Sequence, residues 1–246
     1  MSNKKYNPIE VYEDHYNDPI MIAPKSKQAE YFVIKTKINP SKGSMVFEPG
    51  CGIGTLGSYL MNKFKVNVYG MELSKTAIKM AKSNGIRMKK GDLNNRWPYK
   101  SKFFDYVINL QVIEHILNTD NFIKESKRIL KKDGLLYIST PNLASWFNRI
   151  IFLFGYQPFF TEISNEDKTL GLKFTQSLTL NRTPLGHIRV FTLKGLIDLL
   201  EYHGFVIVNK YGGEIKYLPD FMSPFDKFFS NFPSLASDLF IIAKKK

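Results

Sequence analysis

The chain alternates short apolar runs with segments in which apolar residues recur every three or four positions. Strand-like runs occur at 45–47, 66–73, 86–88, 104–110 and 135–139, and helical periodicity occurs at 56–64, 74–83 and 120–130. Continuous apolar strands that alternate with helices are typical of a parallel sheet covered on both faces. The pattern predicts an α/β protein with a doubly wound sheet.

Beyond residue 142 the pattern weakens, and residues 143–186 show no clear period. Thr192 is expected to cap a helix that ends near His203, and the runs 205–208 and 238–243 read as two further strands. Ser223, followed by a proline, is the expected N-cap of a short helix. One face of that helix would carry Phe225, Phe228, Phe229 and Phe232.

The composition limits the class of protein. A chain of 246 residues with 43% hydrophobic residues can bury a core, and a single cysteine excludes both an internal disulfide and a four-cysteine zinc site. The net charge of +13 is open to several interpretations. Only six of the 35 basic residues are arginines, and residues 45–142 alone hold 16 basic against 8 acidic residues. A lysine-rich surplus is weak evidence for nucleic-acid binding, because arginine is the preferred reader of phosphate and guanine.

The strongest chemical signal is the loop Glu48-Pro49-Gly50-Cys51-Gly52-Ile53-Gly54, which follows a strand and opens a helix. Alternate glycines let the backbone turn tightly and approach a ligand. A dinucleotide fingerprint would place its third glycine at position 55, which is threonine here. Glu48 also suits a cationic ligand better than a pyrophosphate, and a glycine-rich turn without a ligand is the alternative.

Three more features follow at the ends of successive strands. Glu72 ends the strand after the glycine loop, where a carboxylate can accept both hydroxyls of a ribose. Asp92 can accept a hydrogen bond from an adenine amino group, and Leu93 can pack on the ring. The strand 105–110 ends in a polar turn that contains Asn109, Gln111 and His115. That position is where the reacting centre of a doubly wound sheet lies.

In their order and spacing, these motifs resemble those of the class I S-adenosylmethionine-dependent methyltransferases, within the broad family that includes the quinone-biosynthesis methyltransferases. The resemblance covers about residues 40–142, with a looser similarity at 186–192. It implies a Rossmann-like sheet of seven strands whose last strand is antiparallel, and it implies S-adenosylmethionine as the cofactor. By the same resemblance, the cofactor-binding residues are Glu48, Gly50, Cys51, Gly52, Gly54, Glu72, Leu73, Asp92, Leu93, Asn109 and Gln111.

We therefore expect one methyltransferase domain over 1–246. It would comprise an N-terminal cap segment (1–44), a cofactor-binding half (45–142), an aromatic-rich lid insertion (143–186) and a C-terminal helix and strand hairpin (187–246). In similar enzymes a leading segment folds over the cofactor, and Tyr16 is a candidate for that role beside an ordinary surface position.

His115 and His187 are the candidate catalytic residues, because an oxygen or amine acceptor can require removal of a proton. For each, a structural histidine bonded to backbone is the alternative. Glu114-His115 could help to hold a divalent metal, as in similar quinone methyltransferases. No further acidic cluster stands nearby in the sequence, so no metal is assigned.

The region 143–232 holds 13 of the 20 phenylalanines, which favours an apolar acceptor pocket or a surface that rests on a membrane, or else a small satellite core. Lys124, Lys127, Arg128, Lys131 and Lys132 are expected to form one basic face of the helix before the fifth strand, solvated or in contact with anionic lipid. The polar start of the chain lacks a signal-peptide pattern, and no apolar stretch reaches a membrane-spanning length, so the expected location is cytoplasmic, with peripheral membrane contact open.

The function expected from the sequence is methyl transfer from S-adenosylmethionine to a small, apolar or lipid-linked acceptor, most simply at oxygen. Nucleic-acid acceptors are disfavoured, because the run Asn109-Leu110-Gln111-Val112 lacks the Pro-Pro-aromatic pattern of base amino-methylation and Cys51 lies inside the glycine loop. Two alternatives remain. One is a methyltransferase that acts on RNA or protein, and the other is a non-catalytic module that binds S-adenosylmethionine.

Overall fold

A computed structural model describes residues 26–176, 183–215 and 220–246. Within them the chain forms a single seven-stranded sheet with the strand order β3-β2-β1-β4-β5-β7-β6. The strands are β1 (Met45–Pro49), β2 (Asn67–Glu72), β3 (Arg87–Lys90), β4 (Phe104–Leu110), β5 (Leu130–Pro141), β6 (Phe205–Gly213) and β7 (Asp238–Lys245). Neighbours from β3 to β5 pair in parallel, whereas β7 is antiparallel to both β5 and β6. The doubly wound sheet with an antiparallel last strand is confirmed.

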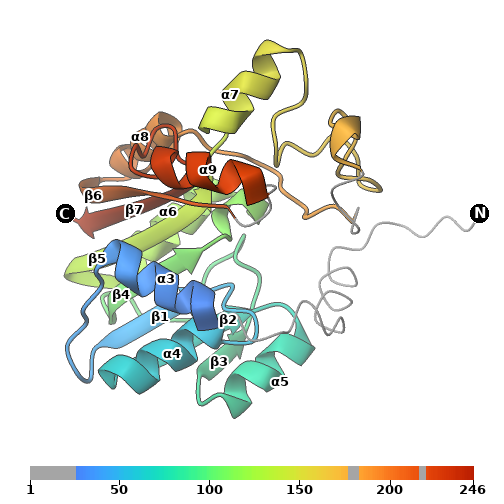
Figure 1. The fold of residues 1–246 in the computed structure, drawn as a ribbon. Helices are drawn as coiled ribbons and strands as arrows, with labels where there is room; N and C mark the ends of the chain where they lie inside the picture. The colour runs from blue at the N-terminus through green and yellow to red at the C-terminus, as the bar shows by residue number, and fades with distance from the viewer. Residues whose placement is uncertain (1–25, 177–182, 216–219) are drawn as a thin grey trace, which may run out of the picture.

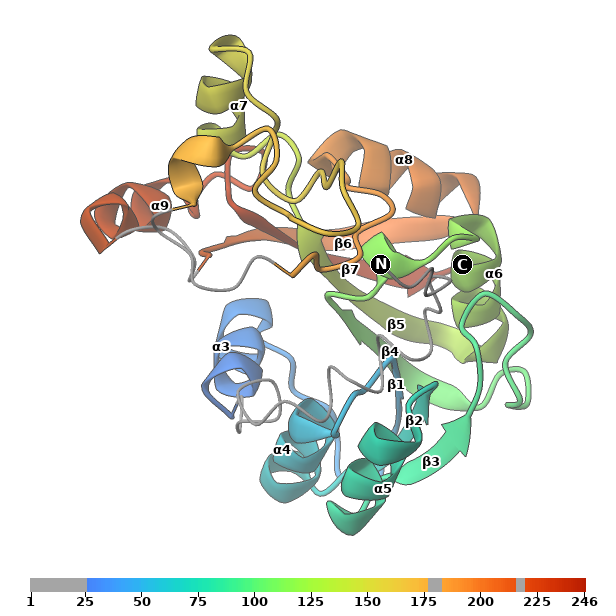
Figure 2. The same cartoon turned by 90° about the vertical axis from the view of Figure 1, so that its right-hand side faces the viewer.

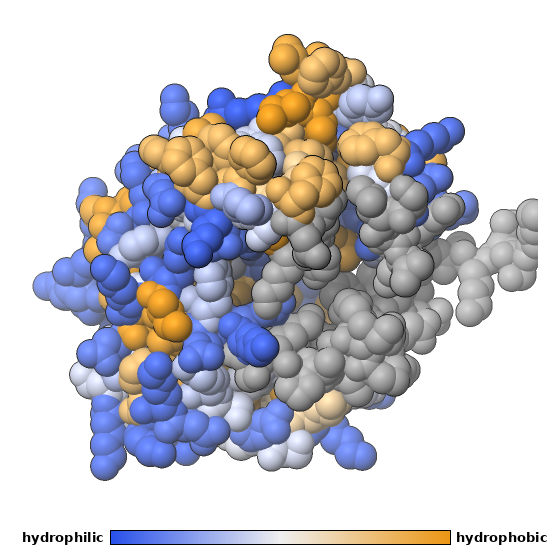
Figure 3. All heavy atoms as spheres, in the orientation of Figure 1, coloured by the Kyte–Doolittle hydropathy of each residue, from blue (hydrophilic) through white to orange (hydrophobic). Residues whose placement is uncertain are grey.

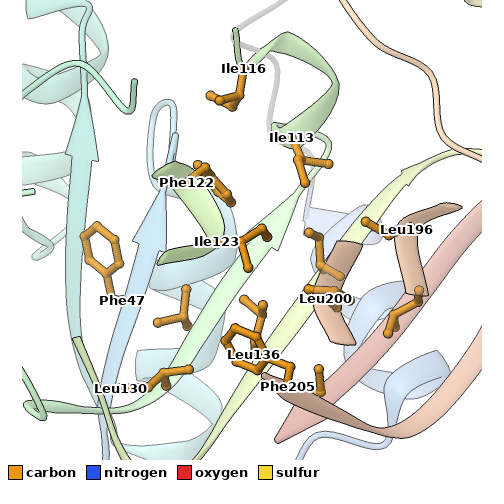
Figure 4. Packing of buried hydrophobic residues seen from close by; sticks show 14 of the residues in the cluster. Phe47, Ile113, Ile116, Phe122, Ile123, Leu130, Leu136, Leu196, Leu200 and Phe205 are labelled. Carbon is orange, nitrogen blue, oxygen red and sulfur yellow. The ribbon is translucent and has the colours of Figure 1, made fainter. Parts of the chain in front are cut away.

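Helices cover both faces of the sheet (Figures 1 and 2). On one face lie α3 (Ser26–Thr36), α4 (Thr55–Phe64) and α5 (Lys75–Ser83), and on the other lie α6 (Thr119–Ile129) and α8 (Leu193–Tyr202). Each face buries its own apolar cluster. Figure 4 shows Phe122 and Ile123 of α6 beside Leu196 and Leu200 of α8, all packed against the strands.

Two helices stand apart from these layers. They are α7 (Trp146–Leu153) and α9 (Ser223–Phe229), and both lie above the β6–β7 side of the sheet in Figure 1. The short 3-10 turns η1 (Ile113–His115), η2 (Lys173–Thr175) and η3 (Asp220–Met222) lie in connections. Together with the loops around 154–176, α7 and α9 form an aromatic-rich lid, and this part of the fold prediction is confirmed.

Several boundaries differ from the sequence-based expectation. No sequence pattern predicted α3, and α7 lies in a stretch without a clear period. The capping prediction for Ser223 is wrong, because Met222 is the N-cap and η3 runs directly into α9. Ser74 and Thr192 do cap their helices, since each side chain accepts a hydrogen bond from the backbone N–H three residues on.

The predicted basic face on the helix before β5 is also wrong. α6 ends at Ile129, and Lys131 and Lys132 belong to β5. Arg128 pairs with Glu125 at 2.6 Å, and Lys127 donates to the His203 carbonyl at 2.8 Å. Arg128 and Lys127 are therefore engaged in contacts within α6 and with the end of α8, and the five cations do not form one solvated face.

Candidate cofactor and acceptor site

The glycine loop connects β1 to α4 at the carboxyl-terminal edge of the parallel strands, which faces the viewer in Figure 2. Gly50 and Gly54 have φ angles of 63° and 80°, in the left-handed region that disfavours other residues. A Cβ on Gly50 would lie 2.8 Å from a Val112 methyl, and one on Gly54 would overlap the Ile86 methyl and lie 3.3 Å from the Ala81 backbone. Backbone conformation and close packing therefore both require glycine here, as the sequence pattern indicated.

Glu72 holds the glycine loop against the end of β2. One of its carboxylate oxygens accepts from the Gly52 N–H at 3.1 Å, and the other accepts from the Leu73 N–H at 2.7 Å. The two strand ends are thereby fixed relative to each other before any ligand binds. Glu72 is buried, so the structure places it at the predicted site with its oxygens oriented by backbone donors.

Glu48 is buried at the end of β1, and one of its carboxylate oxygens, Oε2, makes no hydrogen bond within the described part of the chain. Burial raises the pKa of Glu48 to about 8, with a smaller contribution from the nearby Glu72 and in spite of a hydrogen bond from the Gly57 backbone. An ammonium group, such as that of the methionine moiety of S-adenosylmethionine, would supply the missing partner and stabilise the carboxylate.

Asn109 is fully buried near the end of β4, and neither its Oδ1 nor its Nδ2 atom has a partner in the described part of the chain. Native proteins rarely bury an amide without hydrogen bonds, so this side chain fits a ligand-binding role. Gln111, two residues on, has a φ angle of 55° and donates through its side chain to Ser139 Oγ at 3.3 Å. Its backbone is held by the Ser139 carbonyl.

The remaining predicted cofactor residues contribute in other ways. Asp92 accepts hydrogen bonds from Asn94 and Asn95, which shape the loop after β3. Leu93 is buried beside Gly50. The Cys51 thiol points toward Met88, with 3.4 Å between the sulfur atoms, and burial raises its pKa well above the usual range. Cys51 therefore packs beneath the loop, and its thiol is unsuited to nucleophilic attack.

The structure brings His115 and His187 together, although 72 positions separate them in the chain. Their ring centroids lie 4.8 Å apart. His115 Nδ1 lies 3.1 Å from the Gly186 carbonyl, and His187 Nδ1 lies 3.3 Å from the Phe160 carbonyl. A carbonyl oxygen only accepts, so each Nδ1 carries the proton and each Nε2 keeps a lone pair. Burial lowers both pKa values, that of His187 to about 3 with His115 adding to the effect, so both rings are neutral at pH 7.

A carboxylate that the sequence analysis did not identify organises the histidine pair. Glu162 accepts from the backbone N–H groups of Leu185, Gly186 and His187 at 2.6, 2.8 and 3.2 Å. From the other side, the Arg189 guanidinium donates to the carbonyls of Ile116 and Leu117. No local motif signals these contacts, because they join segments that lie more than 20 residues apart.

Glu114 lies beneath the histidine pair and is fully buried. Thr140 Oγ1 donates to its carboxylate at 3.0 Å, and burial raises its pKa to about 8 despite that hydrogen bond. One ligand atom each of Glu114, His115 and His187 lie within 4.8 Å of one another. Among the described residues, this group could coordinate a divalent metal ion, a geometry that only the folded chain reveals.

A path of aromatic contacts leads from the lid to the histidines. Trp146 stacks on Phe229 with ring centroids 5.2 Å apart and contacts Phe147 at 5.7 Å. From Phe147 the contacts continue to Phe159 at 5.3 Å, to Phe160 at 5.8 Å and to His187 at 5.5 Å. The inner part of the lid is thus a satellite core that ends at the histidine pair.

The outer face of the lid is exposed. Large apolar side chains gather over α7 and α9 at the top of Figure 3, with exposed fractions of 81% for Leu153, 72% for Phe154 and 59% for Phe228. The inner side of the lid is thus the satellite core that the sequence allowed, and the outer side exposes apolar side chains. Within the described residues, no helix is long and apolar enough to cross a bilayer.

The comparisons with known proteins agree with this geometry. A methyltransferase-domain family model matches residues 27–210. A ubiquinone biosynthesis O-methyltransferase of Pelagibacter ubique is 33% identical over 148 residues, which span 57% of this chain and 58% of the relative. A cyclopropane-fatty-acyl-phospholipid synthase of Escherichia coli is 26% identical over 58% of this chain and 40% of its own length. The matches thus span roughly half of these curated relatives.

Solved structures share the fold across nearly the whole chain. A possible histamine N-methyltransferase of Thermotoga maritima superposes with a TM-score of 0.60 at 19% identity, covering 98% of this chain and 95% of that one. A phosphoethanolamine N-methyltransferase of Haemonchus contortus in complex with S-adenosyl-L-methionine gives 0.62 at 14% identity, covering 99% of this chain and 58% of that one.

Fold and comparisons together define the class of this chain as a methyltransferase domain. The chain belongs to the methyltransferase-domain family whose model it matches over most of its length.

Proposed function

We propose that this methyltransferase transfers a methyl group to an oxygen atom of a small, apolar or lipid-linked acceptor, such as a quinone-like phenol. The observation that carries the proposal is the aromatic path that ends at the neutral His115–His187 pair. An apolar body could lie along the path while its hydroxyl reaches an Nε2 lone pair. The names of the ubiquinone and fatty-acyl-phospholipid relatives support an acceptor of this kind.

The cofactor supplies a methyl group that its sulfonium charge has already activated for in-line displacement. In the proposed arrangement, Glu48, the glycine loop, Glu72 and Asn109 hold the methionine and ribose parts, and Asp92 and Leu93 hold the adenine. The Nε2 atom of His115 takes the hydroxyl proton as the oxygen–methyl bond forms and the sulfur–methyl bond breaks, which leaves S-adenosylhomocysteine. His187, whose pKa of about 3 makes it the weaker base, orients the acceptor beside the His115 ring. Because the histidines contact each other and the lid, the closed site would also exclude water from the reacting atoms.

The second part of the proposal concerns location. We place the protein in the cytoplasm, with the outer face of α7 and α9 resting on a membrane surface. Leu153 at the end of α7, its C-cap Phe154 and Phe228 on α9 are all more than half exposed. Apolar side chains gather over these two helices at the top of Figure 3. An apolar surface of this kind inserts at the headgroup boundary, and it would bring the lid to the phase in which a lipid-like acceptor dissolves.

The decisive experiment is incubation of the protein with methyl-labelled S-adenosylmethionine and fractionated cell extract. We expect label in the lipid-extractable fraction, lost in the His115→Asn/His187→Asn double variant. Label in RNA or protein would overturn the proposed acceptor class, and cofactor binding without turnover on any fraction would favour a non-catalytic module. A parallel reaction with a chelator tests for a metal at Glu114, His115 and His187.

Membrane contact is tested separately by vesicle co-sedimentation. The Leu153→Ser/Phe154→Ser variant should lose binding to vesicles of mixed zwitterionic and anionic phospholipid, whereas Ile34→Ser/Tyr202→Ser, which removes exposed apolar side chains elsewhere, should not. Equal loss in both variants would contradict the proposed surface. Equal binding to charge-neutral vesicles would show that the surplus cations play no part.

A further inference from the structure

The crossover from β3 to β4 contains no helix among its described residues, although the crossovers on either side carry α5 and α6. Among the described residues, the loop 91–103 is what covers β2 and β3 on the α6 face of the sheet. A cavity of about 580 Å³ opens beside the edge strand β3, between this loop and the end of α5. It is lined by Tyr69, Lys82, Ile86, Arg87, Met88, Lys89, Pro98, Tyr99, Lys100 and Phe103. None of these residues belongs to the predicted cofactor set.

Three aromatic rings form the apolar wall of this edge cavity. Tyr99 and Phe103 stand almost perpendicular to Tyr69, with interplanar angles of 89° and 87° and centroid distances of 6.4 and 5.6 Å. Tyr99 is fixed in this position because its hydroxyl donates to the Gly70 carbonyl at 2.8 Å. The rings therefore form a preorganised trough, which can receive a flat apolar group without rearrangement.

Of the residues that the structure describes, four cations and no carboxylate line the same cavity. The Arg87 guanidinium lies 5.2 Å from the centre of the Tyr69 ring and donates to its hydroxyl at 2.7 Å. The Lys89 ammonium lies 4.7 Å from the centre of the Tyr99 ring. Both charges are held at the aromatic wall, with Lys82 and Lys100 completing the rim. Part of the positive charge in excess within residues 45–142 thus lies around the aromatic trough, away from the proposed acceptor site.

We propose that the edge cavity binds a free nucleotide, with the base in the aromatic trough and the phosphates among Lys82, Arg87, Lys89 and Lys100. Aromatic and guanidinium faces stack on nucleobases, and an arginine fork pairs with phosphate. The cavity volume falls within the usual range for small-molecule sites. This site does not depend on the proposed acceptor. A nucleotide bound there could regulate the methyl-transfer activity.

Two other occupants fit the geometry less well. A second copy of the chain pairing edge to edge would set Arg87, Lys89 and Lys90 of each β3 against the same cations, which is a known device against strand pairing. A membrane is also disfavoured, because β3 and β6 form opposite edges of the sheet and the exposed lid lies above the β6 side. A chain resting on its lid holds β3 away from the lipid.

The test is calorimetric titration of the full chain with ADP, at low salt and with S-adenosylhomocysteine saturating the cofactor site. We expect one ADP per chain, at least tenfold weaker binding in Arg87→Gln/Lys89→Gln, and little change in the control Lys124→Gln/Lys132→Gln, which removes the same charge from exposed positions elsewhere. The affinity for S-adenosylhomocysteine should be equal in all three proteins, which verifies that the variants fold.

Several results would overturn the proposal. Competition between ADP and S-adenosylhomocysteine would place the nucleotide in the cofactor site. Equal loss in the control variant, or equal affinity for pyrophosphate or for a hexaglutamate peptide, would reduce the effect to non-specific charge. Binding of a single-stranded oligonucleotide without binding of ADP would replace a free nucleotide with nucleic acid as the ligand.

Discussion

On the cofactor side, contacts between neighbouring strand ends hold the site together. Glu72 binds the backbone of Gly52, 20 residues away, across adjacent strands β1 and β2. On the acceptor side, the contacts span much longer separations: His115 bonds to the Gly186 carbonyl, 71 residues away. The first kind of site needs glycines with fixed backbone angles, whereas the second needs a folded lid. The same edge of the sheet is thus built from two kinds of constraint.

The two sides also differ in the polar groups that they leave without partners. Glu48 and Asn109 on the cofactor side retain buried atoms with no partner among the described residues. On the acceptor side, Glu162 has both of its oxygens engaged by backbone donors, and Glu114 Oε1, beneath the histidine pair, is the one buried atom on that side without a partner among the described residues. We infer that the cofactor side awaits several polar ligand groups, whereas the acceptor side presents apolar surface, two neutral imidazoles and a single buried carboxyl. Variants on the cofactor side should therefore lower the affinity for the cofactor, whereas variants on the acceptor side should lower the rate of methyl transfer.

The largest expected effect is on turnover. His115→Asn and His187→Asn keep a donor for the carbonyl that each Nδ1 contacts but remove the Nε2 lone pair. Loss of the general base in His115→Asn lowers the rate by roughly 10²–10⁴-fold, and His187→Asn should lower it less, because a pKa of about 3 makes His187 a weak base. The rate of methyl transfer is measured in single-turnover reactions with labelled cofactor. The affinity for the cofactor, measured by calorimetry, should be unchanged. If either variant lost cofactor affinity to the same extent, the division between the two sides would be wrong.

Glu48→Gln should lower the affinity for the cofactor and leave turnover at saturating cofactor nearly unchanged, the reverse of the histidine variants. It removes the carboxylate that a cationic ligand group would pair with, at a cost of about 1.5–3 kcal/mol, or about tenfold or more in cofactor affinity. Turnover at saturating cofactor should change much less. Glu30→Gln, on the exposed side of α3, is the matched control. An unchanged dissociation constant for Glu48→Gln would remove Glu48 from the cofactor site.

Asn109→Leu separates stability from function on the cofactor side. Leucine has the same branched shape and number of heavy atoms without burying an unpaired amide, so the unfolding free energy of the free protein should rise by about 1–3 kcal/mol. Cofactor affinity should fall in the same variant, because the amide is no longer available. Urea denaturation and calorimetry measure the two quantities. A loss of stability would show that Asn109 already has partners in the folded chain.

Glu48 also predicts a dependence of stability on pH. Its folded pKa of about 8 exceeds the ordinary value of 4.5, so its contribution is fully present below pH 4.5 and is lost as the pH rises through 8. Between pH 5 and 9, the melting temperature of the free protein should fall more for the wild type than for Glu48→Gln. Saturating cofactor should raise the melting temperature of the wild type more than that of Glu48→Gln at the alkaline end of this range. If the melting temperatures of the two free proteins changed with pH in parallel, the argument from the burial of Glu48 would be contradicted.

The comparison also explains what the sequence could predict. Glycines with positive φ and continuous apolar strands are local requirements, so β1 to β5, the loop 50–54 and Glu72 could be predicted from short motifs. Glu162 could not, because its three backbone partners lie at 185–187. The residues of α7 also mix an inner aromatic face with an outer apolar face, which conceals the helical period.

The smallest effect should come from the outer face of the lid, and it sharpens the contrast with the inner face. Trp146 donates through Nε1 to buried Asp226 at 2.9 Å and stacks on Phe229, so Trp146→Phe should lower the unfolding free energy by about 1–3 kcal/mol. Leu153, which is 81% exposed, has little to lose, and Leu153→Ser should change that free energy by less than about 0.5 kcal/mol. Urea denaturation of the two variants decides the point. Equal destabilisation would mean that the outer face of α7 is covered by protein, and a membrane-facing lid would then be untenable.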